Sequence, residues 1–136
     1  MIRGFTCSAF DLLHPGHVLM LKECKEQCDY LIVGLQDDPS VAPDSYRGKK
    51  KNKPIETLAE RRIRLEGCKY VDEIHVYETE EDLYKLLQKL KPDVRFLGPD
   101  WQGKHYTGWD LPIKIIFNSR DHNFSSTSLR DRIKNS

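Results

Sequence analysis

The stretch that decides the fold runs from Ile2-Arg-Gly-Phe-Thr-Cys-Ser8 into Phe10-Asp-Leu-Leu-His-Pro-Gly-His17. The first part is short and alternates apolar with polar residues, which predicts a β-strand. Pro15 opens a helix, because proline is favoured in the first helical turn, and apolar residues follow at near-helical spacing up to Cys28. The sequence therefore predicts a strand, a turn carrying two histidines, and a helix.

The rest of the chain continues to alternate strand and helix. Residues 30–35 form a continuous apolar run, which is typical of a strand covered on both faces. We expect further helices over residues 57–68, 79–91 and 125–133, and further strands over 71–77, 94–97 and 113–117, with a polar break from 36 to 54. This order predicts one α/β domain over residues 1–136, a Rossmann-like open parallel sheet of about five strands with helices on both faces. In such sheets ligands bind beyond the carboxyl ends of the strands, where the strand order reverses.

The amino-acid composition excludes some classes of function. The chain has 136 residues, and 22 Lys plus Arg against 21 Asp plus Glu leave a formal net charge of +1. That balance argues against a generic nucleic-acid coat or a polybasic membrane protein. No apolar run approaches the roughly 20 residues of a membrane helix, and the amino terminus lacks the build of a signal peptide. We expect a cytoplasmic protein with neither a nucleic-acid nor a membrane partner.

The four cysteines are not spaced as a CxxC motif. Cys24 and Cys28 lie four residues apart in a predicted helix and therefore share one face. We expect small buried side chains in a reducing compartment, and no metal site.

The turn before the first helix carries the clearest chemical signal. A helix amino terminus attracts phosphate, and Gly16 allows close approach of the backbone. His14 and His17 can donate hydrogen bonds to charge developing on a phosphoryl oxygen. This arrangement favours phosphate transfer over proton abstraction from carbon. Asp11 either fixes the turn or takes part in binding.

Residues 10–17 resemble the HxGH signature of the cytidylyltransferase-like nucleotidyltransferases. The resemblance is closest to the glycerol-3-phosphate cytidylyltransferases and continues in order along the chain. The other matching segments are Cys28 to Val33, Glu60-Arg61 with Lys69-Tyr-Val-Asp-Glu73, Gly98-Pro-Asp-Trp-Gln-Gly-Lys104, and Arg120 with Phe124-Ser-Ser-Thr127.

The resemblance implies transfer of CMP from CTP to a small phosphomonoester such as glycerol 3-phosphate, with release of pyrophosphate. Mg²⁺ would accompany the triphosphate, and a homodimer is implied. The same fold with another nucleotide or acceptor, for example an adenylyltransferase or a phosphocholine or phosphoethanolamine acceptor, is the alternative. A non-catalytic nucleotide-binding relative and a nucleic-acid-binding module are further alternatives.

A basic segment, Arg47-Gly-Lys-Lys-Lys-Asn-Lys53, places five positive charges in seven residues. It is a solvated loop, a nucleic-acid contact or a clamp for triphosphate, and the resemblance favours the clamp, with Lys50 nearest the matching position.

The resemblance assigns catalysis to His14, His17 and Lys50, and substrate contacts to Arg61 and Trp101. Tyr106 and Trp109 are packing or acceptor contacts. The implied nucleotide-binding residues are Ser8, Ala9, Phe10, Asp11, Gly16, Lys51, Lys53, Lys69, Gly98, Asp100, Trp101, Arg120, Ser125, Ser126 and Thr127.

Four positions, at three places in the chain, depart from the family pattern. Ser8-Ala9 stands where Gly-Thr is usual, Lys69 replaces an arginine, and Asp121 replaces a threonine. Ser8 adds a side chain where the backbone approaches phosphate, and lysine does not reproduce the planar fork of arginine. These changes bear on activity and on the choice of nucleotide and acceptor.

Overall fold

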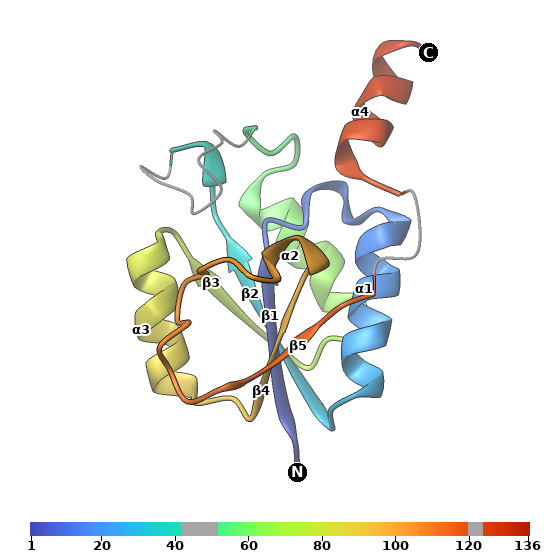
Figure 1. The fold of residues 1–136 in the computed structure, drawn as a ribbon. Coiled ribbons are helices and arrows are strands. Elements are labelled where there is room, and N and C mark those ends of the chain that lie inside the picture. Colours follow the sequence, from blue (N-terminus) through green and yellow to red (C-terminus); the bar gives the residue numbers. More distant parts are fainter. Residues whose placement is uncertain (42–51, 120–123) are drawn as a thin grey trace.

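A five-stranded parallel sheet in the order β3-β2-β1-β4-β5 forms the centre of the molecule (Figure 1). Its strands are β1 (Arg3–Ser8), β2 (Tyr30–Gln36), β3 (Glu73–Tyr77), β4 (Val94–Leu97) and β5 (Lys114–Phe117). The structure is a computed structural model that describes residues 1–41, 52–119 and 124–136, without the side chain of Ser126. The predicted fold class is confirmed.

Helices cover both faces of the sheet. α1 (Pro15–Glu26) and α2 (Leu58–Glu66) lie against one face, and α3 (Glu80–Leu90) lies against the other (Figure 1). α4 (Ser126–Lys134) extends away from the sheet at the carboxyl terminus. Three short 3₁₀ turns connect these elements: Asp11–Leu13, Pro39–Val41 and Pro99–Trp101. Each predicted helix and strand is present, with ends that differ from the prediction by a few residues.

The two faces have separate cores, as the strand alternation requires. On the α1 and α2 side, Leu31 and Val33 of β2 pack with Phe96 of β4. On the α3 side, Ile32 packs with Phe5. The cysteines are free, and Cys24 is buried in the first core.

The strand order reverses beside β1. The chain passes from β1 outward to β2 and β3, then crosses to β4 on the other side of β1. The carboxyl ends of the strands lie at the upper edge in Figure 1, where α1 also begins. The strand pattern predicts a ligand site at this point.

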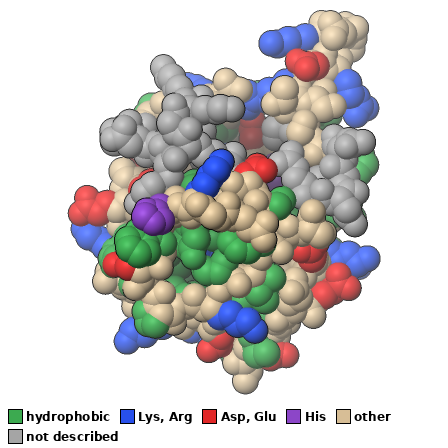
Figure 2. All heavy atoms as spheres, viewed as in Figure 1, with side chains coloured by type: hydrophobic (Ala, Val, Ile, Leu, Met, Phe, Trp, Pro, Cys, Tyr) green, Lys and Arg blue, Asp and Glu red, His purple; other side chains and the backbone are tan. Residues whose placement is uncertain are grey.

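Among the described residues on the viewed surface, acidic and basic side chains are interspersed (Figure 2). Hydrophobic side chains gather at its centre, and acidic and basic side chains lie around them (Figure 2). Among the described residues, no helix combines the length and apolarity that spanning a membrane requires.

Arg61 of α2 forms hydrogen bonds that connect the ends of β1 and β2. Its side chain is 2% exposed, and its guanidinium donates hydrogen bonds to four backbone carbonyls. Its Nη1 lies 3.1 Å from the oxygen of Ala9 and 2.6 Å from that of Gln36. Asp37 and Glu56 supply the other two carbonyls. One side chain thus fixes the segments that leave two central strands.

Replacing Arg61 by Ala should therefore lower the free energy of unfolding by about 3 kcal/mol or more, because buried carbonyls lose their donors. Urea unfolding measures the change. Arg61→Lys should fall between wild type and Arg61→Ala. The matched control is Arg62→Ala, because Arg62 is exposed and, among the described residues, forms an ion pair with the exposed Glu66 alone. Its effect should stay within about 0.5 kcal/mol. Equal effects of the Arg61→Ala and Arg62→Ala substitutions would contradict this assignment.

Candidate active site

The turn between β1 and α1 has an unusual backbone. Phe10, Leu12 and Leu13 have φ angles of 50°, 64° and 28°, in the left-handed region that residues with a side chain seldom adopt. Such conformations cost about 1–2 kcal/mol per residue. They persist only where surrounding contacts hold them.

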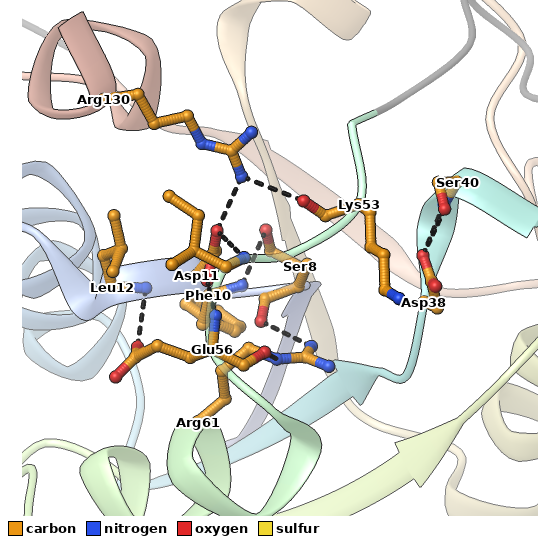
Figure 3. A network of polar contacts seen from close by, with 12 residues as sticks. Ser8, Phe10, Asp11, Leu12, Asp38, Ser40, Lys53, Glu56, Arg61 and Arg130 are labelled. Carbon is orange, nitrogen blue, oxygen red and sulfur yellow. Dashed lines mark hydrogen bonds and ion pairs between the residues drawn. The ribbon is translucent and has the colours of Figure 1, made fainter. Parts of the chain in front are cut away.

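The Asp11 carboxylate supplies several of these contacts (Figure 3). Its oxygens accept hydrogen bonds from the N–H groups of Ile55 at 2.8 Å and Glu56 at 3.0 Å. Arg130 of α4 donates to it at 2.7 Å. Burial alone would raise the pKa of Asp11, but these donors hold the pKa below its ordinary value of 3.8. Of the two interpretations of Asp11, the geometry supports fixing the turn.

The same contacts hold the segment that follows the basic stretch. Glu56 Oε1 accepts a hydrogen bond from the N–H of Leu12 at 2.8 Å, and Arg130 also lies 3.3 Å from the carbonyl oxygen of Lys53. The side chain of Lys53 points toward Asp38 in Figure 3. Lys53 is thus joined to the turn through its backbone. Lys50 and Lys51 lie outside the described residues.

His14 and His17 stand together at the start of α1. His14 is the N-cap of the helix, and its Nδ1 accepts a hydrogen bond from the N–H of His17 at 3.3 Å. This bond places the proton of a neutral His14 ring on Nε2. The two rings stack with their centroids 3.7 Å apart. Pro15 occupies the first turn as predicted.

A cavity of about 380 Å³ opens at this point of the sheet edge. One wall comes from α1, and the opposite wall comes from the ends of β3 and β4 and the start of α3. The end of β1 lies between the two walls. The expected site residues that line the cavity are Ser8, His14, Gly16, His17, Gly98, Asp100, Trp101 and Ser125.

The remaining expected residues lie elsewhere. Ala9, Phe10, Asp11 and Thr127 are not part of the lining. Ser125 is the N-cap of α4 and accepts a hydrogen bond from the N–H of Ser128 at 3.0 Å. Arg120 and the variant position Asp121 lie outside the described residues, as does the side chain of Ser126.

Two expected site residues have other surroundings. Arg61 was expected to contact substrate, but its guanidinium is committed to backbone carbonyls and is not part of the cavity lining. Lys69 precedes β3, at the amino ends of the strands, where its Nζ lies 5.2 Å from the ring centroid of Tyr70. Because the cavity lies at the carboxyl ends, the chain does not bring Lys69 to it.

The cavity also contains polar residues that the motifs did not indicate. Arg95 of β4 lines the wall opposite α1, together with Tyr77, Glu80 and Thr107. Burial raises the pKa of Tyr77. A charged residue inside the apolar run of β4 was the available signal, because such a side chain needs a specific reason to be buried.

The comparisons with known proteins agree with the fold and the turn. The cytidylyltransferase-like family matches residues 5–132. A crystal structure of a lipopolysaccharide core biosynthesis protein from Thermoplasma volcanium is 30% identical, with a TM-score of 0.67 over 88% of this chain and 97% of that one. Pantothenate synthetase from Thermus thermophilus shares the fold at 13% identity, with a TM-score of 0.58 over 97% of this chain and 64% of that one.

Curated relatives include proteins named "Bifunctional protein HldE". The protein from Wolinella succinogenes is 41% identical over 114 residues, and that from Campylobacter concisus is 35% identical over 130 residues. These alignments cover 82% and 96% of this chain but only 23% and 26% of the relatives. This chain therefore spans about a quarter of their length. With a family match over nearly all its residues and an HxGH turn at the switch point of the sheet, the chain belongs to the cytidylyltransferase-like family of nucleotidyltransferases.

Proposed function

We propose that this chain transfers a nucleotidyl group from a nucleoside triphosphate to the phosphate of a small phosphorylated sugar, with release of pyrophosphate. The observation that carries the proposal is the stacked pair His14 and His17 at the start of α1, in the wall of a cavity at the switch point. The first N–H groups of a helix lack partners within it and favour an anion there.

In the proposed reaction, an oxygen of the acceptor phosphate attacks the α-phosphorus of the nucleotide. A new phosphorus–oxygen bond forms as the bond to the bridging oxygen breaks, and pyrophosphate carries away the electron pair. The chain contributes positioning and hydrogen bonds rather than a nucleophile. His14 Nε2 and the His17 ring stabilise charge on the transferring phosphoryl group.

The choice of acceptor follows from the relatives. The sequence resemblance places CTP and glycerol 3-phosphate first, with another nucleotide or acceptor as the alternative. A relative whose structure is described as that of a lipopolysaccharide core biosynthesis protein, at 30% identity, supports the alternative, because that name refers to a saccharide product. We place ATP ahead of CTP because Ser8, which lines the cavity, departs from the cytidylyltransferase pattern.

Mg²⁺ enters this proposal with the nucleotide, as part of the substrate. Among the described residues, no group of three or more His, Cys, Asp or Glu side chains is placed to hold a metal ion. Lys50, Lys51 and Arg120 stay proposed contacts for the phosphates, and the homodimer stays a prediction.

The decisive experiment measures pyrophosphate release with each of the four nucleoside triphosphates, with Mg²⁺, against a panel of sugar phosphates, glycerol 3-phosphate and phosphocholine. We expect release with ATP and a sugar phosphate. His17→Ala should lower kcat about 10²- to 10³-fold, because one hydrogen-bond donor to the transition state is lost. The matched control is His75→Ala, because His75 lies on β3, pairs with Glu73 and does not line the cavity.

Other outcomes distinguish the alternatives. Pyrophosphate release with CTP and glycerol 3-phosphate alone would instead support the glycerol-3-phosphate cytidylyltransferase activity that the sequence resemblance implies. Nucleotide binding without release on any acceptor would indicate a non-catalytic relative. Salt-sensitive binding of RNA or DNA without release would indicate a nucleic-acid-binding module. Equal activity of His17→Ala and wild type would overturn the role given to the histidines.

The contact between Arg130 and Asp11 predicts a positioning effect from outside the cavity. Arg130→Ala removes a donor to the Asp11 carboxylate and frees the turn that carries the histidines. We expect kcat to fall by about 5- to 20-fold, since small displacements at a reacting centre are costly, with a smaller change in the KM for nucleotide. The matched control is Arg132→Ala, an exposed residue of the same helix. Equal kcat values for both variants would contradict the positioning role.

Acid should weaken the same contact. The pKa of Asp11 in the folded protein is below its ordinary value of 3.8. The ionised carboxylate therefore contributes fully to the free energy of unfolding above pH 3.8, and this contribution is lost as the pH falls through the folded pKa. In urea unfolding between about pH 2 and 6, Asp11→Asn should lose stability at neutral pH and show a shallower decline on acidification than wild type. Asp131→Asn, at an exposed position of α4, is the control and should follow wild type. Parallel declines for wild type and Asp11→Asn would refute the prediction.

A further inference from the structure

Arg95 is a buried cation in the cavity wall that faces away from α1. It lies on β4 between Val94 and Phe96, whose side chains belong to the core on the α1 side. Because side chains alternate along a strand, Arg95 lies on the opposite face, toward α3. It is only 3% exposed.

The contacts of Arg95 leave its charge uncompensated. Its Nη1 donates a hydrogen bond to the carbonyl oxygen of Thr107, and its Nη2 lies 3.9 Å from Cys7 Sγ, a weak acceptor. Its Nε is buried without a hydrogen-bond partner. Its Cζ lies 5.4 Å from the ring centroid of Tyr106. Within the described ranges, no carboxylate lies within 4.0 Å to form an ion pair with it.

Such a placement is costly unless something else occupies the cavity. A guanidinium remains charged at any physiological pH, and a buried charge without a partner costs several kcal/mol. A packing role alone would be served by an apolar residue. The planar fork of arginine matches phosphate, with which it forms paired, charge-assisted hydrogen bonds.

Groups that can bind hydroxyls line the same wall as the guanidinium. The Thr107 hydroxyl donates a hydrogen bond to Glu80 Oε2, at 2.5 Å, while the Thr107 carbonyl accepts from Arg95. The phenol of Tyr77 is in the same wall and keeps its proton, since burial raises its pKa. An anion-binding group and several hydrogen-bonding groups therefore meet at one place, as a phosphorylated sugar requires.

The cavity divides into two halves across the end of β1. The half beside α1 holds the two histidines, and the half beside α3 holds Arg95, Glu80 and Thr107. A transfer between two phosphates needs both anions in one cavity, with the attacking and transferring groups adjacent. The helix start can serve only one of them.

We propose that the α3 half of the cavity is the acceptor subsite, in which Arg95 binds the acceptor phosphate and Glu80 with Thr107 orients its hydroxyl groups. This assignment rests on the proposed function, which supplies the acceptor class. Arg95 thereby selects phosphomonoesters over neutral sugars.

Steady-state kinetics with the acceptor found in the screen test this assignment. Arg95→Gln should raise the KM for the acceptor about 10- to 100-fold, the loss expected for hydrogen bonds to a charged group, and leave the KM for the nucleotide within about twofold. Arg95→Lys, which keeps the charge but not the fork, should fall between. The unphosphorylated sugar, used as a competitive inhibitor, should bind wild type and Arg95→Gln equally. Equal rises in both KM values, or no rise for the acceptor, would overturn the assignment.

A matched control distinguishes loss of phosphate binding in Arg95→Gln from a general structural effect of that substitution. Arg3 also donates to a backbone carbonyl, that of Leu90 at 2.7 Å, but lies outside the cavity. Arg3→Gln should change neither KM. If Arg95→Gln does not fold, the comparison rests on Arg95→Lys, whose acceptor KM must rise for the proposal to stand.

A binding measurement separates this proposal from the proposed function. Inorganic phosphate is titrated calorimetrically into His17→Ala and into the double variant His17→Ala/Arg95→Gln at constant ionic strength. The single variant should bind phosphate through Arg95, and the double variant should bind at least about tenfold more weakly. Equal binding by both would refute the subsite. If wild type releases no pyrophosphate while the two variants still differ, the proposed function fails and the anion site stands.

Discussion

The geometry of the candidate site depends on one buried carboxylate. Asp11 accepts hydrogen bonds from the segment before α2 and from α4, far away in the sequence. Without these contacts, three non-glycine residues would not remain in left-handed conformations between β1 and α1. The start of α1, and with it the two histidines, is therefore positioned by tertiary contacts rather than by local preference.

Arg61 complements Asp11 from below the turn. Asp11 accepts hydrogen bonds from backbone N–H groups and a guanidinium, whereas Arg61 donates hydrogen bonds to carbonyl oxygens, including those of Ala9 and Gln36. Each satisfies backbone groups that leave the sheet and so lack ladder partners. Most of these hydrogen bonds join a side chain to the backbone, and the bond from Arg130 to Asp11 joins two side chains.

Local patterns were sufficient to predict the elements and the principal turn. The alternation of strand and helix and the proline at the start of α1 are local signals, and the structure confirms both. The helix predicted from Thr57 is also present, and it begins with a capping box between Thr57 and Glu60. The position of Lys69 was available from the sequence, because Lys69 precedes the strand predicted over residues 71–77 and ligands bind beyond the carboxyl ends of such strands. The role of Arg61 was not available, because its carbonyl partners Ala9 and Gln36 lie far from it in the sequence. Lys69 precedes its strand, and the cavity follows the strands. Arg95 carried a detectable signal, a charge within an apolar strand, but its partner Thr107 lies in a distant loop.

The switch point explains how one cavity can present two unlike walls. Because β1 has β2 on one side and β4 on the other, the space above its end is bordered by helices from opposite faces of the sheet. α1 contributes a helix start and imidazoles, which suit a phosphoryl group undergoing transfer. The α3 side contributes a fixed guanidinium and hydroxyl-binding groups, which suit recognition of a phosphorylated polyol. Residues on opposite faces share no local sequence, so the acceptor wall can change without disturbing the histidines.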